Sequence, residues 1–304
     1  MTVATADYEL LSAEAGAVVR EGRAVIELAG SEAAEFLQGQ VSQDVEAIEP
    51  GAGAYATLLD HKGKIRTDLR VLRLAEDRLL VDAESIGLPV LLHVFQTFSL
   101  GRDVRTSDMT RTRAVVSLIG PAARVLVDPS PPAEEHRWVE ALGGIAVATD
   151  LGLDLIVPTD ELPAALALAP AASEEAAECV RIESGRPRLG LDMGSTTIPQ
   201  EAGLNERAVS FEKGCYVGQE TVARLHWRGR PNRHLRGLRL SEPAVRGEPI
   251  TLGERELGTL GSTYVSPTFG PIALALVRRE AGPGDEVSVG GAPATVVELP
   301  FERE

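Results

Sequence analysis

A thiol, an ammonium group and an aromatic ring lie close together in the segment Glu212-Lys-Gly-Cys-Tyr-Val-Gly-Gln-Glu220. The residues that follow predict a helix over 219–226, so Cys215 stands just before a helix N-terminus. A thiol near a helix N-terminus and an ammonium group tends to have a lowered pKa and to react as the thiolate. Cys215 is therefore a candidate reactive thiol, and a half-buried structural cysteine in a tight loop is the alternative.

Lysine is confined to two short glycine-containing segments. Lys62 and Lys64 lie in His61-Lys-Gly-Lys64, Lys213 precedes Cys215 by two positions, and every other residue among the 30 Lys plus Arg is arginine. Two interpretations stay open. Arginine-rich coding could leave three lysines by chance, or these loops need a compact ammonium, which binds differently from a guanidinium.

A second candidate group is the carboxylate of Glu183, in the last turn of a helix predicted over 173–184. Glu183 follows Cys179 and Val180 by four and three positions, so it shares their face and points toward apolar surroundings. A carboxylate at this end opposes the helix dipole unless a partner offsets the cost. That partner is either Arg181 or Arg186 in a salt bridge, or the hydrogen-bond donors of a planar heterocyclic ligand.

Six arginines, with two histidines and a tryptophan among them, lie between Arg224 and Arg239. Such a patch suits an anionic partner: a polyglutamate tail, a phosphate, or a folded RNA bound through phosphate and stacking contacts. The alternative is a solvated domain junction whose arginines pair with the acidic surface.

The elements expected to position these groups alternate between strands and helices, which indicates mixed α/β layers. Two strands flank the turn at 60–64 as a predicted hairpin. Ser31 is the predicted N-cap of the helix after the first strand, because Glu32 and Glu35 lie in its first turn. The predicted strands are 23–28, 53–59, 65–74, 79–82, 114–119 and 154–157, and the helices begin near 31, 88, 121, 161, 173 and 219.

The sequence pattern changes after Pro231, where short apolar segments alternate with Gly and Pro turns. This pattern predicts a small antiparallel barrel or sandwich. The domain boundary is therefore expected at 230–234, with a first region over 1–230 and a second over 231–304.

Composition excludes several classes of protein. With 30 Lys plus Arg against 45 Asp plus Glu, the formal net charge is −15, which argues against non-specific coating of nucleic acid. The longest apolar run, 87–100, contains Pro89, His93 and Gln96, so no membrane span is expected. The acidic start does not resemble a secretory signal, and a cytoplasmic protein is predicted. Two distant cysteines, Cys179 and Cys215, are too few to hold a zinc ion or an iron–sulfur cluster alone.

These motifs resemble those of the folate-binding YgfZ family, relatives of the aminomethyltransferase T-protein (GcvT) of the glycine cleavage system. The resemblance covers nearly the whole chain, and its most specific part is Lys213-Gly-Cys-Tyr-Val-Gly-Gln-Glu220. The other matching segments are Phe36-Leu-Gln-Gly-Gln-Val-Ser-Gln-Asp44, Asp60-His-Lys-Gly-Lys64, Arg181-Ile-Glu-Ser-Gly-Arg-Pro-Arg188, Ile198-Pro-Gln-Glu-Ala-Gly203 and 258–277.

The resemblance implies an α+β fold: a ring of modules around a tetrahydrofolate pocket, with two interleaved α/β modules in the folate-binding region and a small C-terminal barrel. Glu183 matches the glutamate that recognises the pterin ring, and a carboxylate can accept paired N–H donors from an aminopyrimidinone edge. Thr67-Asp68 stands where T-proteins carry two adjacent acidic residues, one of them catalytic. Asp68 is thus a weak catalytic candidate, and aminomethyl transfer is not favoured. The expected folate contacts are Glu183, Lys213, Gly214, Tyr216, Gly218, Gln219 and Arg224.

In the YgfZ family the cysteine motif is tied to synthesis or repair of iron–sulfur proteins, including enzymes that modify tRNA. The resemblance therefore makes Cys215 the functional thiol at the rim of the folate pocket, and one possible ligand to a cluster held with a partner. Lys213 would favour the thiolate, while Gly214 and Gly218 would let a ligand approach the backbone. The expected function is tetrahydrofolate binding in support of iron–sulfur enzymes, with an assembly or client protein as partner. A folate-dependent transferase or demethylase and an RNA-contacting module are the alternatives.

Overall fold

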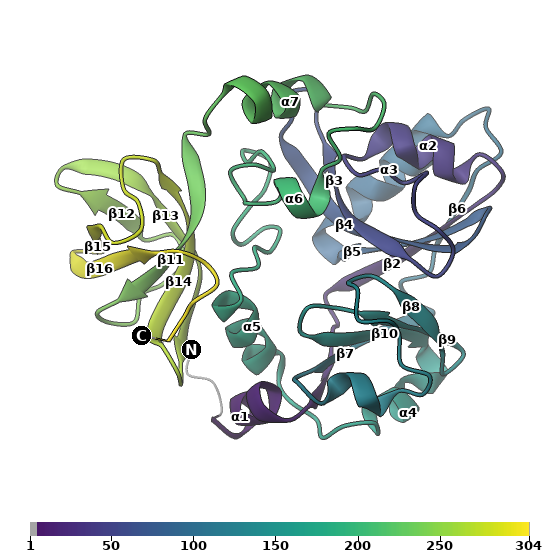
Figure 1. The fold of residues 1–304 in the computed structure, drawn as a ribbon, viewed down its shortest axis with the longest axis horizontal. Coiled ribbons are helices and arrows are strands. Elements are labelled where there is room, and N and C mark those ends of the chain that lie inside the picture. Colours follow the sequence, from purple (N-terminus) through teal and green to yellow (C-terminus); the bar gives the residue numbers. More distant parts are fainter. Residues whose placement is uncertain (1–4, 304) are drawn as a thin grey trace.

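The computed structural model describes residues 5–303. Two five-stranded sheets and a closed barrel form a ring, and helix α5 (Glu174–Glu183) lies in the middle of it (Figure 1). This arrangement confirms the α+β ring predicted from the family resemblance. Within 5–303, no helix is long and apolar enough to cross a membrane.

The first sheet has the strand order β3-β4-β5-β2-β6 and is antiparallel throughout. Its strands are β2 (Arg23–Ala29), β3 (Gly53–Leu59), β4 (Ile65–Ala75), β5 (Arg78–Glu84) and β6 (Arg105–Asp108). One face packs its apolar side chains against helices α2 (Ala33–Gln40) and α3 (Leu88–Phe98). The opposite face is turned toward the middle of the ring.

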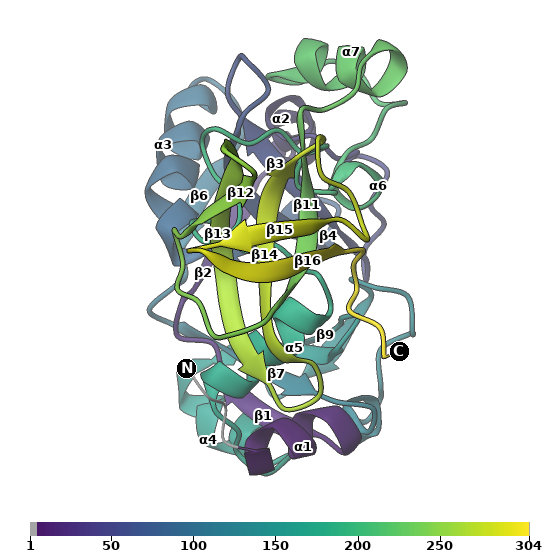
Figure 2. The same ribbon diagram turned by 90° about the vertical axis from the view of Figure 1, so that its left-hand side faces the viewer.

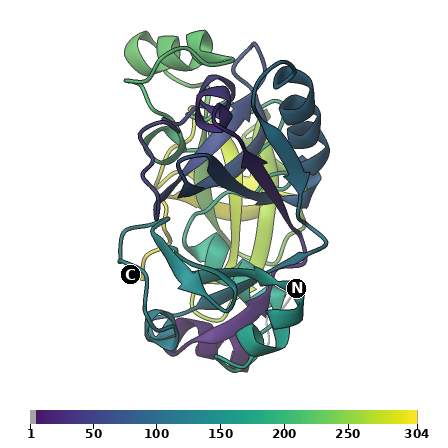
Figure 3. The same cartoon turned by 90° about the vertical axis from the view of Figure 1, so that its right-hand side faces the viewer.

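The second sheet has the order β1-β7-β10-β9-β8. Its strands are β1 (Gly16–Val19), β7 (Arg113–Ile119), β8 (Trp138–Ala141), β9 (Gly144–Ala148) and β10 (Gly152–Pro158). Strand β1 precedes the whole first sheet in the chain, yet it pairs with β7 in the second. The strands of the two sheets are therefore interleaved along the chain. Figure 3 views both sheets from the side opposite the barrel.

The barrel closes in the order β11-β14-β13-β12-β15-β16 and stands apart from both sheets, facing the viewer in Figure 2. Its strands are β11 (Arg233–Leu240), β12 (Pro249–Leu252), β13 (Arg255–Ser266), β14 (Gly270–Arg278), β15 (Glu286–Val289) and β16 (Ala292–Val297). Small and branched apolar side chains fill its interior.

The remaining helices connect the three bodies. Helix α1 (Thr5–Ala13) packs on α5 at one end of the ring, and α7 (Gln219–Arg228) lies at the other end (Figure 1). Helices α4 (Leu162–Leu166) and α6 (Asn205–Ala208) are short. Single 3₁₀ turns occur at Ser85–Gly87, Ala123–Leu126 and Thr159–Glu161.

Most predicted elements are confirmed, and three details are wrong. The Ser31 hydroxyl does not cap α2, because it donates to the Asp103 carboxylate at 2.7 Å. The helix expected up to residue 127 is the 3₁₀ turn at 123–126, and the helix expected from 161 has only five residues. In these short segments, local sequence sets the turn, but tertiary contacts set its length.

Candidate functional site

A cavity of about 210 Å³ lies between the two sheets and α5. Strand alternation builds its walls, because neighbouring side chains on a strand point to opposite faces. On β4, Asp68 and Arg70 line the cavity, whereas Leu69 and Val71 pack into the core beside α2 and α3. Ser117 on β7 lines it in the same way. We call this space the central cavity; its charged wall residues are Arg20, Arg23, Asp68, Arg70, Glu84, Glu135, Asp150, Asp154, Arg181, Arg186, Arg188 and Arg207.

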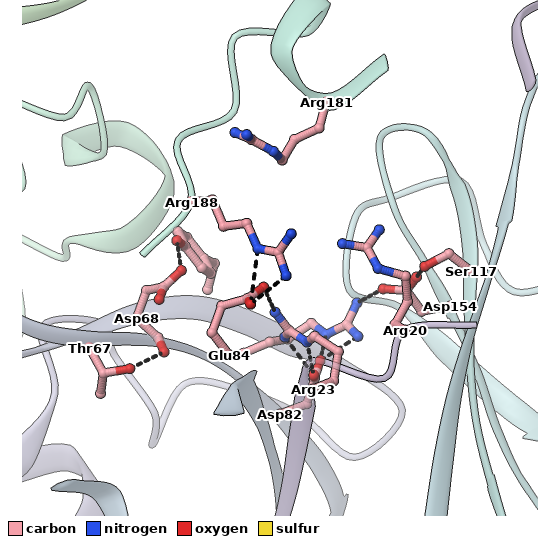
Figure 4. Close-up of polar contacts among 12 residues, drawn as sticks. Arg20, Arg23, Thr67, Asp68, Asp82, Glu84, Ser117, Asp154, Arg181 and Arg188 are labelled. Atoms are coloured by element: carbon pink, nitrogen blue, oxygen red, sulfur yellow. Dashed lines mark hydrogen bonds and ion pairs between the residues drawn. The ribbon is translucent and has the colours of Figure 1, made fainter. Parts of the chain in front are cut away.

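A fully buried carboxylate, Asp82, anchors the floor of the central cavity (Figure 4). Its two oxygens accept from Arg23 Nε and Arg70 Nε, each at 2.8 Å. Arg70 continues to Asp154 at 2.8 Å, and the Ser117 hydroxyl donates to the other Asp154 oxygen at 2.6 Å. Burial alone would raise the pKa of Asp82, but the two guanidinium groups outweigh it and lower that pKa below its ordinary value.

Arg188 closes the side of the cavity nearest α5. Its guanidinium donates to Glu84 on the first sheet and pairs with Glu178 on α5, both at 3.0 Å. Arg181 also pairs with Glu178 at 3.0 Å and reaches Asp192 at 3.0 Å. Ion pairs therefore connect the helix in the middle of the ring to the sheet around it.

Asp68 is buried and held by one hydrogen bond: the Tyr55 hydroxyl donates to Oδ2 at 2.5 Å. Oδ1 has no partner within residues 5–303. Burial raises the pKa of Asp68 above its ordinary value, although Tyr55 and Arg23 oppose the shift. The neighbouring Thr67 is fully buried, and its hydroxyl bonds to the Asp68 carbonyl, so it does not line the cavity. The wall thus carries one titratable acid at this position.

Two further buried atoms of the cavity wall lack a hydrogen-bond partner in the described part of the chain, Arg20 Nε and His136 Nδ1. A buried polar group left unpaired costs about 1–3 kcal/mol. Together with Asp68 Oδ1, these atoms give the central cavity unused donor and acceptor capacity, as a site for a polar ligand requires.

Glu183 lines a different cavity, of about 500 Å³, between α1, the end of α5 and the barrel. Its carboxylate accepts from the Tyr8 hydroxyl at 3.0 Å, the Ser266 hydroxyl at 2.5 Å and the Cys179 thiol at 3.6 Å. Within residues 5–303 no ion pair joins Glu183 to Arg181, whose guanidinium pairs with Glu178 and Asp192. The partner that offsets the helix dipole is thus a set of hydroxyl groups.

The segment around Cys215 is fixed by Lys213. The buried Lys213 ammonium donates to the carbonyls of Gln38, Val41 and Gln43, at 2.5, 2.8 and 2.8 Å, at the end of α2. Burial lowers the pKa of Lys213 to about 8, against the opposing charges of nearby carboxylates. The expectation that Lys213 favours a thiolate therefore meets a competing role, because three carbonyls engage its three donors. Cys215 itself is exposed.

The glycine-containing segments that hold all the lysines are packed on each other. Gly218 has φ +85°, and a Cβ there would lie 2.4 Å from the Asp60 carbonyl oxygen and 3.2 Å from Gly63 Cα. Only glycine fits such a conformation at such a close approach. Lys64 donates to the Thr196 carbonyl at 2.8 Å. Lys64 and Lys213 thus both use a compact ammonium on backbone carbonyls, whereas Lys62 is exposed.

The six arginines between Arg224 and Arg239 fall into two groups, one before the barrel and one within it. Arg233 pairs with Glu201 and Arg236 pairs with Glu298. These arginines of the barrel thus pair with acidic residues, as the alternative of a solvated domain junction predicts. Arg224 and Arg228 are exposed on α7. On the same helix His226 stacks on Phe211, and Trp227 is 69% exposed.

The structure brings together only part of the predicted site. Asp68 lines the central cavity; Glu183 lines the neighbouring one; the rest of the expected folate contacts line neither. Cys215 lines neither of these two cavities. Tyr216 is buried under the Lys213 ammonium, 5.1 Å from ring centroid to Nζ, and Gly214 is exposed. Sequence reasoning missed the cavity residues Arg23, Arg70, His136 and Asp154, and also missed Asp82 on the floor. For Arg70, Asp82 and Asp154 the available signal was a charged residue inside an apolar strand.

The two sheets, interleaved in the chain, and the C-terminal barrel together form a GcvT-like fold. The model of the GCVT N-terminal domain matches residues 4–138, and the model of the glycine cleavage T-protein C-terminal barrel domain matches residues 233–302. The chain belongs to the YgfZ/GcvT-like folate-binding family.

The relatives carry two kinds of name. An aminomethyltransferase of Rubrobacter xylanophilus is 27% identical, over 98% of this chain and 86% of its own. The tRNA-modifying protein YgfZ of Aliivibrio fischeri is 26% identical, over 91% of this chain and 90% of its own. The solved structure of the glycine cleavage system aminomethyltransferase T from Bartonella henselae has a TM-score of 0.87 and 24% identity, covering 98% of this chain and 89% of that one. This last likeness supports the fold.

Proposed function

We propose that the chain binds tetrahydrofolate or a derivative in the central cavity and supports the synthesis or repair of iron–sulfur enzymes, with Cys215 as a functional thiol. The observation that carries the folate part is the pair of buried atoms without a hydrogen-bond partner, Asp68 Oδ1 and His136 Nδ1, both in the wall of one cavity of a folate-binding family fold. The tRNA-modifying name of the Aliivibrio relative supports the choice of tRNA-modifying enzymes as clients.

The size and charge of the central cavity support a ligand of which only the ring end is enclosed. Its volume of about 210 Å³ is below the roughly 300–1,000 Å³ of pockets that enclose a drug-sized ligand. A bicyclic pterin ring would occupy it, and the tail would extend outward. Seven arginines and five carboxylates line the wall, and Asp82, Glu178 and Asp192 pair with several of these arginines from outside the lining. A wall arginine can pair with a carboxylate of an anionic tail such as that of folate.

Two carboxylates compete for the role of pterin acceptor. Glu183 is the residue expected from the family resemblance, but it faces the neighbouring cavity. Asp154 lies in the central cavity, where Ser117 and Arg70 orient its oxygens. Anaerobic calorimetry with tetrahydrofolate on wild type, Glu183→Gln, Asp154→Asn and the exposed control Glu286→Gln separates them. We expect saturable binding by wild type and the control, and loss in one of the two site variants. Absence of binding by wild type would refute the folate part.

The thiol part rests on the exposure of Cys215. The other cysteine, Cys179, is buried and hydrogen-bonded to Glu183, and burial raises its pKa to about 12. Cys215 is thus the thiol that a client protein can reach. In a strain that lacks the gene, we expect wild type but not Cys215→Ser to restore the activity of iron–sulfur enzymes. Equal restoration by both would remove the thiol from the function.

The second candidate is a folate-dependent aminomethyltransferase or demethylase, favoured by one observation. Asp68 keeps a raised pKa and a free oxygen in the cavity wall, as a general acid or base requires. Incubation with tetrahydrofolate, a panel of donors such as sarcosine and dimethylglycine, and an added electron acceptor that takes the two electrons lost by the N-methyl group would reveal methylene-tetrahydrofolate and the demethylated amine. Their formation by wild type and loss in Asp68→Asn would establish this activity, and absence across the panel would exclude it for those donors.

A further inference from the structure

His136 occupies a backbone conformation that favours glycine or asparagine. Its φ is +70°, and its N–H donates to the Ala148 carbonyl at 2.8 Å, so β9 holds the residue there. A left-handed conformation costs a residue with a Cβ about 1–2 kcal/mol. Strained residues of this kind cluster at functional sites, where the surrounding structure over-determines them. The imidazole that accompanies this strain lines the central cavity.

The surroundings of the imidazole assign its two nitrogens. Nε2 lies 3.7 Å from a carboxylate oxygen of Glu135, which Arg207 also contacts. This distance is too long for a hydrogen bond, but the nearby negative charge favours the tautomer with the proton on Nε2, in which Nδ1 is a hydrogen-bond acceptor. Nδ1 is buried and has no partner within residues 5–303.

The charges around His136 keep the ring neutral. Burial, with the positive charges of Arg70 and Arg207, lowers its pKa to about 3, although Asp82 opposes the shift. A protonated ring would turn both nitrogens into donors, whereas a neutral ring keeps one acceptor available at physiological pH.

We propose that His136 is a ligand-contacting residue of the central cavity, and that its Nδ1 accepts a hydrogen bond from an N–H group of the bound pterin ring. This inference rests on the proposed function. It extends that function by adding a neutral ring nitrogen as an acceptor to a wall of charged side chains and hydroxyl groups. Such an acceptor takes an N–H group from an aminopyrimidinone, whose edge carries several such donors.

The test compares two replacements at this position. Asparagine tolerates the left-handed conformation and offers an oxygen at nearly the place of Nδ1, whereas leucine removes the acceptor. The chain itself holds a leucine at positive φ, Leu142 at +48°, so the conformation accepts that side chain. The binding of 5-formyl-tetrahydrofolate is measured by calorimetry on the full chain, with thermal unfolding run on each variant. Leu142→Asn, which lies in a different cleft, is the matched control.

We expect His136→Asn to bind within about threefold of wild type and His136→Leu to bind about tenfold more weakly, the effect of one lost hydrogen bond to a buried donor. Equal weakening in both variants would show that the ring acts by packing, and unchanged binding in His136→Leu would show that water satisfies Nδ1. Either result overturns the inference while the proposed function stands. Absence of binding by wild type refutes the proposed function itself. If His136→Leu unfolds, His136→Gly replaces it, because glycine relieves the strain.

Discussion

Replacement of Lys213 by methionine gives the sharpest test of how the Cys215 segment is held. Each of the three bonds from the ammonium to a carbonyl contributes about 1.5–3 kcal/mol, or about 4–9 kcal/mol together. Burial of the charge offsets part of this. The fall of the Lys213 pKa from 10.5 to about 8 corresponds to about 3 kcal/mol, at about 1.4 kcal/mol per unit. Subtracting about 3 from about 4–9 kcal/mol, we expect Lys213→Met to lower the free energy of unfolding at pH 7 by about 1–6 kcal/mol.

The assay is urea unfolding followed by circular dichroism, with Lys62→Met as the matched control. Lys62 is exposed in the other lysine segment, and its replacement is expected to change the free energy by less than about 0.5 kcal/mol. Lys213→Arg should fall between the two, because a planar guanidinium cannot direct three donors at three converging carbonyls. Equal free energies of unfolding for Lys213→Met and Lys62→Met would refute the reasoning.

Three further predictions follow from single residues. The pKa of Asp68 is raised in the folded state, so its contribution to stability is present at acid pH and is lost as pH rises through that pKa. Asp68→Asn should therefore unfold at a higher temperature than wild type at pH 7. Its melting temperature should also fall less than that of wild type between pH 4 and 7. Gly218→Ala should destabilise the protein by about 2 kcal/mol or more, and Gly51→Ala, with φ +88° and open space around it, measures the strain without the clash; equal losses would disprove the close approach. Alkylation of the native protein at pH 8 should label Cys215 and spare Cys179, whose burial raises its pKa to about 12; mass spectrometry of labelled peptides decides, and modification of both at equal rates would contradict the structure.

Local sequence patterns predicted the elements whose structure depends on interactions between residues close in the chain. The hairpin at 60–64, the helix at 88–98 and the change to a barrel after Pro231 follow from periodicity and turn residues, and the structure confirms them. The sequence motif drew attention to Lys213 and Gly218 as ligand contacts, and the structure shows both against the protein's own backbone. Their partners were not predictable, because they lie on α2 and on the β3–β4 turn, more than 150 residues away in the chain.

The central cavity escaped prediction for the same reason. Its floor joins Arg23, Arg70 and Asp82 from three strands, and their pairing depends on strand order. The sequence did contain one usable signal, which is a pair of charged residues within otherwise apolar strands. Arg70 and Asp82 interrupt apolar strands at positions that alternation places opposite the buried leucines and valines. A charged residue in such a place indicates a second, polar face with a function of its own.

The contact between Gly218 and the β3–β4 turn has a mechanical consequence. Strand β4 leaves that turn at Ile65 and reaches the cavity wall at Asp68, three residues or about 10 Å later. The loop that carries the exposed thiol is thus mounted on the outer end of the strand whose inner part faces the ligand space. A ligand in the cavity and Cys215 would therefore be connected through a few residues of β4 and its turn, with no direct contact between the ligand and the sulfur.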